Sequence, residues 1–355
     1  TSPMNVTWEK TKTLNLGLDF AFLNNKFSVS ADYFIQKTED MLLSMPQSLS
    51  FGLSGNPTVN AGTVENKGFE ISLNHRNNVG DLYYHVGVNA TFIKNELTEV
   101  NGSRDEWQGF NPHAKGTITY AKTGHSIGYF NLIKTDGVFQ SQQEIDAYVD
   151  KNGNKIQPNA QPGDLRFVDY NGDGKIDNND RQDVGSAFPK VNLGVSLGAE
   201  WKGFDFNMLL QGAALFDVNL CGLYSSGIRD DTFYTRPFYA DGNTPYYLVE
   251  GAWRPDHTDA KYPRLGIESR SNGGKFSSWW VEDGSYVRLK SIQLGYTIPK
   301  KWSKKAGFER IRAYVAGGNL FTLSHLEHMD PEMPSVNQGY YPQQRTYEFG
   351  LNVTF

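Results

Sequence analysis

The sequence predicts an all-β fold, an antiparallel transmembrane β-barrel of the outer-membrane type, on three observations. Apolar and polar residues alternate along many segments, which is typical of strands with one apolar and one polar face. The connections between these segments are alternately very short and very long, as in membrane barrels. Aromatic residues make up 14% of the 355 residues and 36 residues are glycine, which suits strands and tight turns better than helices.

The alternation is clear in the segment TLNLGLDFAF, where Leu14, Leu16 and Leu18 share one face and Asn15 and Asp19 share the other. The pattern recurs along the chain and predicts nine strands, at about 13–23, 26–38, 66–77, 82–97, 191–201, 204–212, 285–298, 310–322 and 347–355. Each is near the roughly 9–11 residues that a tilted membrane strand needs. We expect Leu14, Leu16, Leu18, Leu193, Val195, Leu351 and Val353 to face lipid, and Asn15, Asp19, Asn192 and Asn352 to face the lumen.

The connections fall into two length classes. Short connections are predicted near Asn24, Asn78 and Lys202, and long ones at 39–65, 98–190, 212–284 and 324–346. Loops longer than about 15 residues are uncommon in compact soluble domains. The connection at 299–309 falls on the short side and has room for one helical turn. The short turns are therefore expected in the periplasm and the long loops outside the cell.

The segment IGYFNLIKTDGVF at 127–139 also has the composition of a strand. Counting it as a membrane span would reverse the order of short and long connections, so we expect it outside the cell, within the loop 98–190. After it, SQQEIDAYV predicts a short helix with Ser141 as N-cap and Glu144 completing a capping box.

The chain is expected to form one domain, 1–355, which is part of a barrel. Nine strands cannot close a barrel in a bacterial family with an even number of strands. We therefore expect the chain to begin in mid-barrel and to need a larger N-terminal part for closure.

Seven blocks of the sequence resemble, in order, blocks of the SusC/RagA-type TonB-dependent outer-membrane transporters. They are WEKTKTLNLGLDF, VENKGFEISL, PGDLRFVDYNGDGKIDNNDR, WRPDHTDAKYPRL, VEDGSYVRLKSIQLGYTIPKKW, GGNLFTL and QRTYEFGLNVTF. The blocks cover nearly the whole chain and correspond to the C-terminal part of such a transporter. The plug domain of the family has no counterpart in these 355 residues.

The resemblance implies a barrel of 22 strands in the bacterial outer membrane that imports nutrients, usually glycans or oligopeptides. It also implies a SusD-like surface lipoprotein that covers the barrel as a lid. Energy would come from TonB, acting through a plug domain. The remaining N-terminal part of the barrel and outer-membrane lipid would be the other partners.

The segment DYNGDGKIDNNDR matches a calcium-binding loop position by position between residues 169 and 180. Gly174 stands at position 6, where the backbone turns sharply, and Asp180 at position 12 replaces the usual Glu. The predicted ligands are Asp169, Asn171, Asp173, the carbonyl of Lys175, Asp177 and Asp180. A set of oxygen ligands favours Ca²⁺. The ion would fix the loop 98–190, and the alternative is a solvated turn that binds nothing.

Other features exclude function classes. The net charge of −5 argues against nucleic-acid binding, and the single Cys221 excludes an internal disulfide. The sequence has no G-x-S-x-G, P-loop or H-E-x-x-H motif, so we predict no enzyme. His325 and His328 stand at helical spacing but lack a third metal ligand. The pairs Trp279–Trp280, Tyr246–Tyr247 and Tyr340–Tyr341 could belong to a membrane-interface girdle or stack on sugar rings.

Two functions remain open on the sequence alone. The first is nutrient import, and the alternative is a calcium-stapled soluble or surface β-sandwich that binds a glycan. A sandwich buries its apolar face, whereas a membrane barrel exposes that face to lipid. The unequal loops and the terminal Phe355 favour the barrel. A glycosidase would need two positioned carboxylates, which the sequence does not single out.

Overall fold

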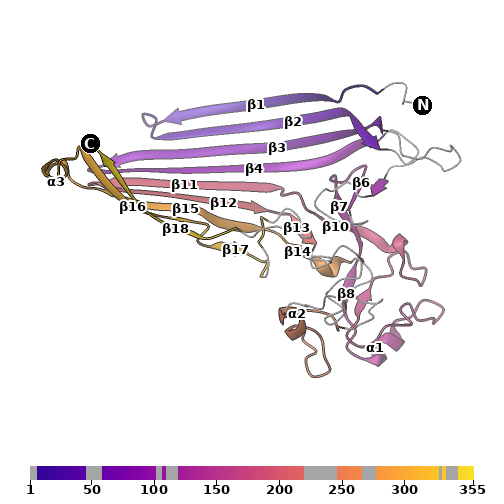
Figure 1. Ribbon diagram of the computed structural model, residues 1–355. Helices are drawn as coiled ribbons and strands as arrows, with labels where there is room; N and C mark the ends of the chain where they lie inside the picture. The colour runs from indigo at the N-terminus through magenta and orange to yellow at the C-terminus, as the bar shows by residue number, and fades with distance from the viewer. Residues whose placement is uncertain are drawn as a thin grey trace.

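The computed structural model describes residues 6–44, 58–100, 106–108, 119–219, 246–265, 277–327, 330–332 and 343–355. These residues form one long antiparallel sheet and a body of short strands and helices at one end of it (Figure 1). The two parts correspond to the regular alternating segments and to the two longest connections of the sequence.

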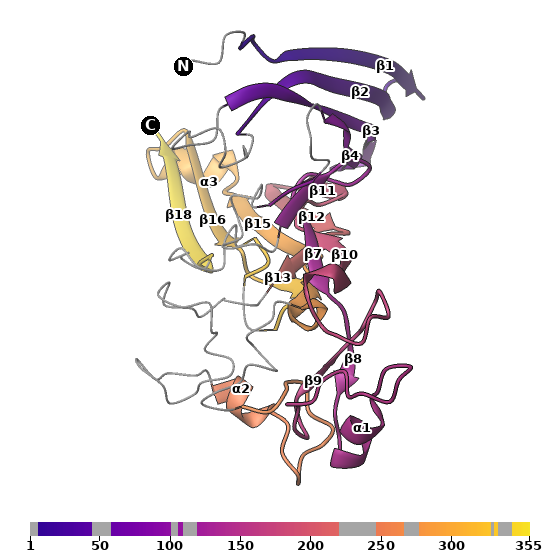
Figure 2. The same ribbon diagram turned by 90° about the vertical axis from the view of Figure 1, so that its right-hand side faces the viewer.

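The long sheet follows chain order except where the long connections intervene. Its strand order is β1-β2-β3-β4-β11-β12-β15-β16-β18, and the short β17 also pairs with β15. The strands are β1 (Lys10–Phe22), β2 (Phe27–Ser44), β3 (Thr58–Val79), β4 (Leu82–Val100), β11 (Val191–Trp201), β12 (Phe204–Ala214), β15 (Tyr286–Thr297), β16 (Arg310–Gly318), β17 (Thr322–Ser324) and β18 (Thr346–Thr354). Every neighbouring pair is antiparallel, and Figure 2 shows the sheet curving from β1 round to β18.

The register keeps apolar side chains on one face across all nine strands. One row on this face runs Leu16, Tyr33, Phe69, Phe92 and Val191, each opposite the next. Because directly opposed residues lie on the same face of a sheet, the alternation of each strand adds up to a continuous apolar surface.

The opposite face carries an equally continuous polar row. Asp19, Ser30, Ser72, Asn89 and Gly194 oppose one another from β1 to β11. The predicted division of the sheet into one apolar and one polar face is therefore confirmed.

The apolar face is not covered by a second sheet of the described chain. Leu16 and Leu351 are 61% and 64% exposed, as expected for side chains that meet lipid and not a protein core. A β-sandwich would bury them. The sandwich hypothesis is therefore wrong for this fold, and the barrel prediction is confirmed.

Several predicted strand bounds are wrong. Strands β2 and β3 extend beyond the expected 26–38 and 66–77, so that part of the expected loop 39–65 continues the ladder. The strand expected at 310–322 ends at Gly318, because Asn319 adopts a left-handed backbone with φ of 52°. The chain then pairs with β15 through β17.

The second part of the molecule, which we call the outer body, is built from the two longest connections. It contains β5 (Glu106–Gln108), β6 (Thr119–Lys122), β7 (Tyr129–Ile133), β8 (Thr135–Val138), α1 (Gln142–Ala147), β9 (Leu165–Phe167), the 3₁₀ turn η2 (Asn178–Asp180), β10 (Arg181–Ser186), α2 (Tyr246–Glu250) and the 3₁₀ turn η3 (Ser278–Trp280). The strands β13 (Asp217–Asn219) and β14 (Val281–Asp283) pair with each other between the two parts. The apolar core lies in the outer body, where Leu132, Phe139, Leu165 and Leu248 are fully buried.

Helices α1 and α3 lie where the sequence predicts them. Ser141 caps α1 by accepting the Glu144 amide, while Glu144 accepts the amide of Gln140 instead of Ser141, so the expected capping box is shifted by one residue. The predicted helical turn at 299–309 is α3 (Lys300–Lys305). The segment 127–139 forms β7 and β8 outside the long sheet, as expected. Among the described residues, no helix is long and apolar enough to cross a membrane.

Because one face of the sheet meets lipid and the other meets water, a lysine introduced on each face should affect stability differently. Val195 lies midway along β11 on the apolar face, opposite Val88 of β4. Asn89, the next residue of β4, lies on the polar face at about the same depth. We expect Val195→Lys to destabilise the inserted protein by about 2–4 kcal/mol, because a charge at mid-membrane must leave water. Asn89→Lys should change its stability by much less.

Urea unfolding of the full protein in lipid vesicles, followed by the gel shift of the folded barrel, measures both variants. Equal losses for the two lysines would contradict the assignment of faces.

Candidate functional site

The polar face is held in shape by an ion pair that bridges one strand. Arg312 of β16 donates from Nε and Nη2 to both carboxylate oxygens of Asp205 of β12, at 2.8 and 2.5 Å. The pair spans β15 at Gly295, where an added Cβ would lie 2.4 Å from Arg312 Nη2. A side chain at this position would break the bridge, so glycine is required by close approach. Two-point contact fixes the guanidinium orientation.

The polar face of β1 to β3 is acidic. Asp32 opposes both Gly17 and Glu70, and Ser30 donates a hydrogen bond to Asp19. The gap above Gly17 is filled by Asp32, whose Oδ1 would lie 2.4 Å from an added Cβ. Like charges placed opposite each other repel. This part of the polar face therefore has a local excess of negative charge.

A buried charge cluster closes the outer end of β15. Arg288 is 3% exposed and donates to Asp330 at 2.5 Å and to Glu332 at 2.9 Å. Lys290 donates to the same Glu332 at 2.8 Å. These contacts hold residues 330–332 against the sheet. If the segment moved away, Arg288 would be left buried without a carboxylate partner, which is energetically costly.

The outer body joins two connections that are far apart in sequence. Arg264 donates to the fully buried carboxylate of Asp164 at 3.0 Å, and Trp253 Nε1 donates to Gln140 at 2.8 Å. The Thr135 amide donates to Ser278 at 3.1 Å. The long connections after β4 and after β12 therefore fold as one unit at the end of the sheet opposite to α3 (Figure 1).

The predicted calcium loop lies between β9 and β10 in this body. Gly174, at position 6, has a φ of 80°, the left-handed backbone that the sharp turn of such a loop requires. Ile176 packs on the apolar cluster of Ile133, Leu165 and Phe167, which anchors the loop to the core. The φ of Gly174 is therefore compatible with position 6 of the predicted loop.

The side chains of the loop accept hydrogen bonds from its own backbone. Asp169 accepts the amides of Gly172 and Gly174, both at 2.8 Å. Asp180 is fully buried and accepts the amides of Tyr170 at 2.9 Å and Asp177 at 2.8 Å. Each carboxylate oxygen has two lone pairs, so the oxygens of Asp169 can still face a cation, whereas Asp180 Oδ1 also accepts the amide of Asn171 at 3.4 Å.

The remaining predicted ligands lie nearer to solvent. Asn171 accepts the amide of Asp173, Asp173 accepts that of Lys175, and Asp177 accepts that of Asn179. Within the described ranges, no three His, Cys, Asp or Glu side chains are grouped closely enough to hold a metal ion. The donor types and the backbone fit Ca²⁺, but the carboxylates point to amides, so the calcium site stays a prediction.

Sequence analysis missed Asp150, which lies against the loop. Its Oδ2 would be 2.9 Å from a Cβ added at Gly174. A hydrogen bond from the Asn154 side chain holds the pKa of Asp150 below its usual value. No local motif links position 150 to position 174, so only the fold reveals this neighbour.

The aromatic and histidine candidates take other roles. Trp280 is 2% exposed and stacks on Tyr262 with ring centroids 6.4 Å apart, so it is a core residue of the outer body. His325 is exposed and lies 3.8 Å from Asp283. Tyr246 is exposed and Tyr247 packs beside Tyr262. Cys221, His328 and the pair Tyr340–Tyr341 lie outside the described residues.

An aromatic girdle forms where the sequence analysis did not place it, beside the short turns. Phe22 stacks on Phe27 across the first turn, and Trp201 stacks on Phe204 across the turn at Lys202. Tyr296 lies 4.6 Å from Phe204 between ring centroids. Aromatic residues at the strand ends next to short turns are the signal that could have revealed it.

Comparison with known proteins agrees with this geometry. The family model described as "TonB dependent receptor-like, beta-barrel" matches residues 2–320. The chain is 31% identical to the TonB-dependent receptor P3 of Formosa agariphila, over 99% of this chain and 34% of that protein. It is 27% identical to the TonB-dependent receptor SusC of Bacteroides thetaiotaomicron, over 99% of this chain and 32% of SusC.

Solved structures show the same fold. The structure of the RagAB peptide transporter superposes with a TM-score of 0.74 at 22% sequence identity, covering 98% of this chain and 36% of that one. The chain therefore spans about a third of the length of the relatives that it matches. The resemblance of the seven sequence blocks is confirmed, and so is the outer-membrane location. The chain resembles SusC in sequence and the RagAB transporter in fold, and it belongs to the TonB-dependent receptor-like β-barrel family.

Proposed function

We propose that this chain forms part of the wall of a TonB-dependent importer that carries nutrients across the bacterial outer membrane. The observation that supports this most is the ten-stranded sheet, apolar on one face and polar on the other. Such a sheet can line a water-filled passage through lipid.

The proposed substrates are glycans or oligopeptides. The structure that resembles this chain is described as a peptide transporter, which supports the second class. The carboxylates Asp19, Asp32 and Glu70 on the polar face disfavour anionic cargo by repulsion. We therefore expect neutral oligosaccharides, or peptides that carry Lys or Arg, over sulfated or uronic-acid glycans.

Uptake by the bacterium tests import and substrate class together. A strain lacking the gene is compared with its parent for uptake of labelled neutral oligosaccharides, basic peptides and uronic-acid oligosaccharides, with and without TonB. We expect loss of one of the first two, and the same loss without TonB. Uptake of all three that is unchanged by either deletion would contradict the proposal.

A SusD-like surface lipoprotein is the proposed partner, docked on the outer body. In support, this body stands at the end of the sheet opposite to the short turns and joins both long connections through named contacts. TonB would act from the other side, through a plug domain that the remaining part of the barrel encloses. The family and the position of the outer body support these two proposed partnerships.

The link between the two connections provides a test of docking. Arg264→Ala removes the guanidinium from the buried carboxylate of Asp164 and should destabilise the outer body by roughly 3 kcal/mol. We expect faster proteolysis of the outer body and weaker co-purification of the lipoprotein, while the barrel still inserts.

Arg166→Ala is the matched control, because Arg166 pairs with Asp136 at the surface of the same body. Exposed pairs contribute only about 0–1 kcal/mol, so this variant should behave as wild type. A loosened outer body that retains the lipoprotein fully would place the docking surface elsewhere.

We also propose that the loop from Asp169 to Asp180 binds Ca²⁺ as a structural ion. Support comes from the left-handed Gly174, from the oxygen-only donors and from the buried Asp180 at position 12. The ion would offset the repulsion between neighbouring carboxylates and fix β9 against β10. Because calcium is plentiful outside the cell, the site would stay filled, and the ion would stabilise the loop and not act as a sensor.

Calcium titration tests the proposed ion. The full protein, stripped with a chelator, should bind one Ca²⁺ per chain at this loop by calorimetry, and its outer body should resist protease better once the ion is restored. Asp173→Ala removes one ligand and should weaken binding about tenfold or more. Asp146→Ala, which removes a surface carboxylate paired with Lys155, should have no effect. Identical titrations of wild type and Asp173→Ala would leave the loop as a turn without metal.

A further inference from the structure

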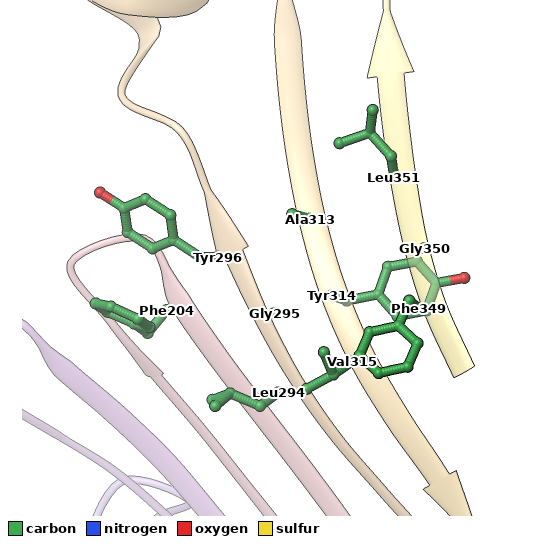
Figure 3. Close-up of a pocket in the computed structure, with 10 residues that line it drawn as sticks. All are labelled: Phe204, Leu294, Gly295, Tyr296, Ala313, Tyr314, Val315, Phe349, Gly350 and Leu351. Carbon is green, nitrogen blue, oxygen red and sulfur yellow. The ribbon is translucent and has the colours of Figure 1, made fainter. Parts of the chain in front are cut away.

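The apolar face of the long sheet contains a groove near the short turns (Figure 3). Its volume is about 550 Å³, and its walls come from β12, β15, β16 and β18. Tyr296, Ala313 and Leu351 oppose one another in one row, and Leu294, Val315 and Phe349 form the next. The methyl group of Ala313 is the smallest side chain of the first row, so the floor is lowest there.

One end of the groove is aromatic. Phe204 and Tyr296 lie 4.6 Å apart between ring centroids, and Trp201 stacks on Phe204. Aromatic rings of this kind gather at the boundary between hydrocarbon and headgroups. The groove therefore begins at the membrane interface and runs into the hydrocarbon layer.

Helix α3 adds a dense positive charge at that same end. It connects β15 to β16, the two strands that form the floor of the groove, and it presents Lys300, Lys301, Lys304 and Lys305 to solvent. Trp302 between them is 64% exposed. No carboxylate of the described chain lies within 4.0 Å of any of these four ammonium groups.

Lysines at the opposite end of the sheet differ in this respect. Lys12 pairs with Glu39 at 2.6 Å, Lys67 with Glu65 at 3.1 Å and Lys94 with Glu96 at 2.5 Å. The unpaired charge is therefore a property of the α3 end and is directly adjacent to an apolar groove. An acyl chain with an anionic head satisfies both features at once.

We propose that this groove and α3 form a binding site for a phospholipid with an anionic headgroup. One acyl chain lies over Ala313 between Tyr296 and Leu351, and the phosphate lies against the lysines of α3. The acyl chain fills the groove and makes van der Waals contacts with side chains that would otherwise be poorly packed. The headgroup gains attraction from several basic side chains at the membrane surface. This site is separate from import.

Native mass spectrometry of the full protein in detergent micelles, with equal phosphatidylglycerol and phosphatidylcholine, tests the site. We expect wild type to retain phosphatidylglycerol about tenfold more than phosphatidylcholine. Ala313→Phe fills the groove and should reduce retention of both lipids. Changing all four lysines of α3 to Gln should remove the preference, and changing them to Arg should preserve it.

Ala90→Phe is the control, since Ala90 lies on the same apolar face opposite Leu193, away from α3. It should bind as wild type. Equal retention of the two lipids by wild type, or unchanged retention in Ala313→Phe, would overturn the proposal. So would full displacement by glycerophosphate, which has no acyl chain and cannot use the groove.

Discussion

The constraint on which the structure depends is the hydrogen-bond ladder of a sheet that lies in lipid. Hydrocarbon offers no partner for a free amide or carbonyl, so a strand there must pair on both sides. The long strands pair in the unbroken antiparallel order β1-β2-β3-β4-β11-β12-β15-β16-β18, and among the described residues only the edge strands β1 and β18 of this order pair on one side alone. Once the ladder is fixed, the period of two assigns each side chain to lipid or lumen, and a slip by one residue would reverse every assignment.

The same constraint explains what the sequence could and could not predict. Between the short turns and the middle of each strand, lipid and water act on opposite faces, and apolar and polar residues alternate with few exceptions, such as Leu209 at the bulge between β12 and β15. Beyond the membrane this ends: Ala61, Val64 and Leu97 pack with Ala121 of the outer body, so β3 and β4 continue without an alternating pattern. The predicted strands stopped short there because their signal is a property of the lipid environment.

The outer body was only partly predictable. The turn at Gly174 and the N-cap of α1 depend on neighbours in sequence, and local motifs identify both. The pair of Asp164 with Arg264 and the contact of Asp150 with Gly174 depend on how distant segments meet. Likewise, Trp280 is an aromatic residue of the kind found in membrane-interface girdles, but it lies in the core of the outer body. The pairing of β13 with β14 brings its segment back against this body.

The two ends of the molecule have different physical characters. The short-turn end carries aromatic rings and the four exposed lysines of α3, which suit a boundary with headgroups. The other end carries paired charges and a buried core, which suit a folded surface that meets another protein. This asymmetry arises because short connections, such as those at 80–81 and 202–203, lie at one end of the sheet, while connections long enough to fold lie at the other end.

Collision measurements on nitroxide labels test the central claim most directly. Single cysteines are placed at Leu16, Val195 and Leu351 and at Asn15, Ser196 and Asn352, with Cys221→Ser as the background, in the full protein in lipid vesicles. The first three labels should collide mainly with oxygen dissolved in lipid, and the second three mainly with a nickel chelate in water. Loss of this alternation, or its reversal, would contradict a sheet with one lipid face and one lumen face.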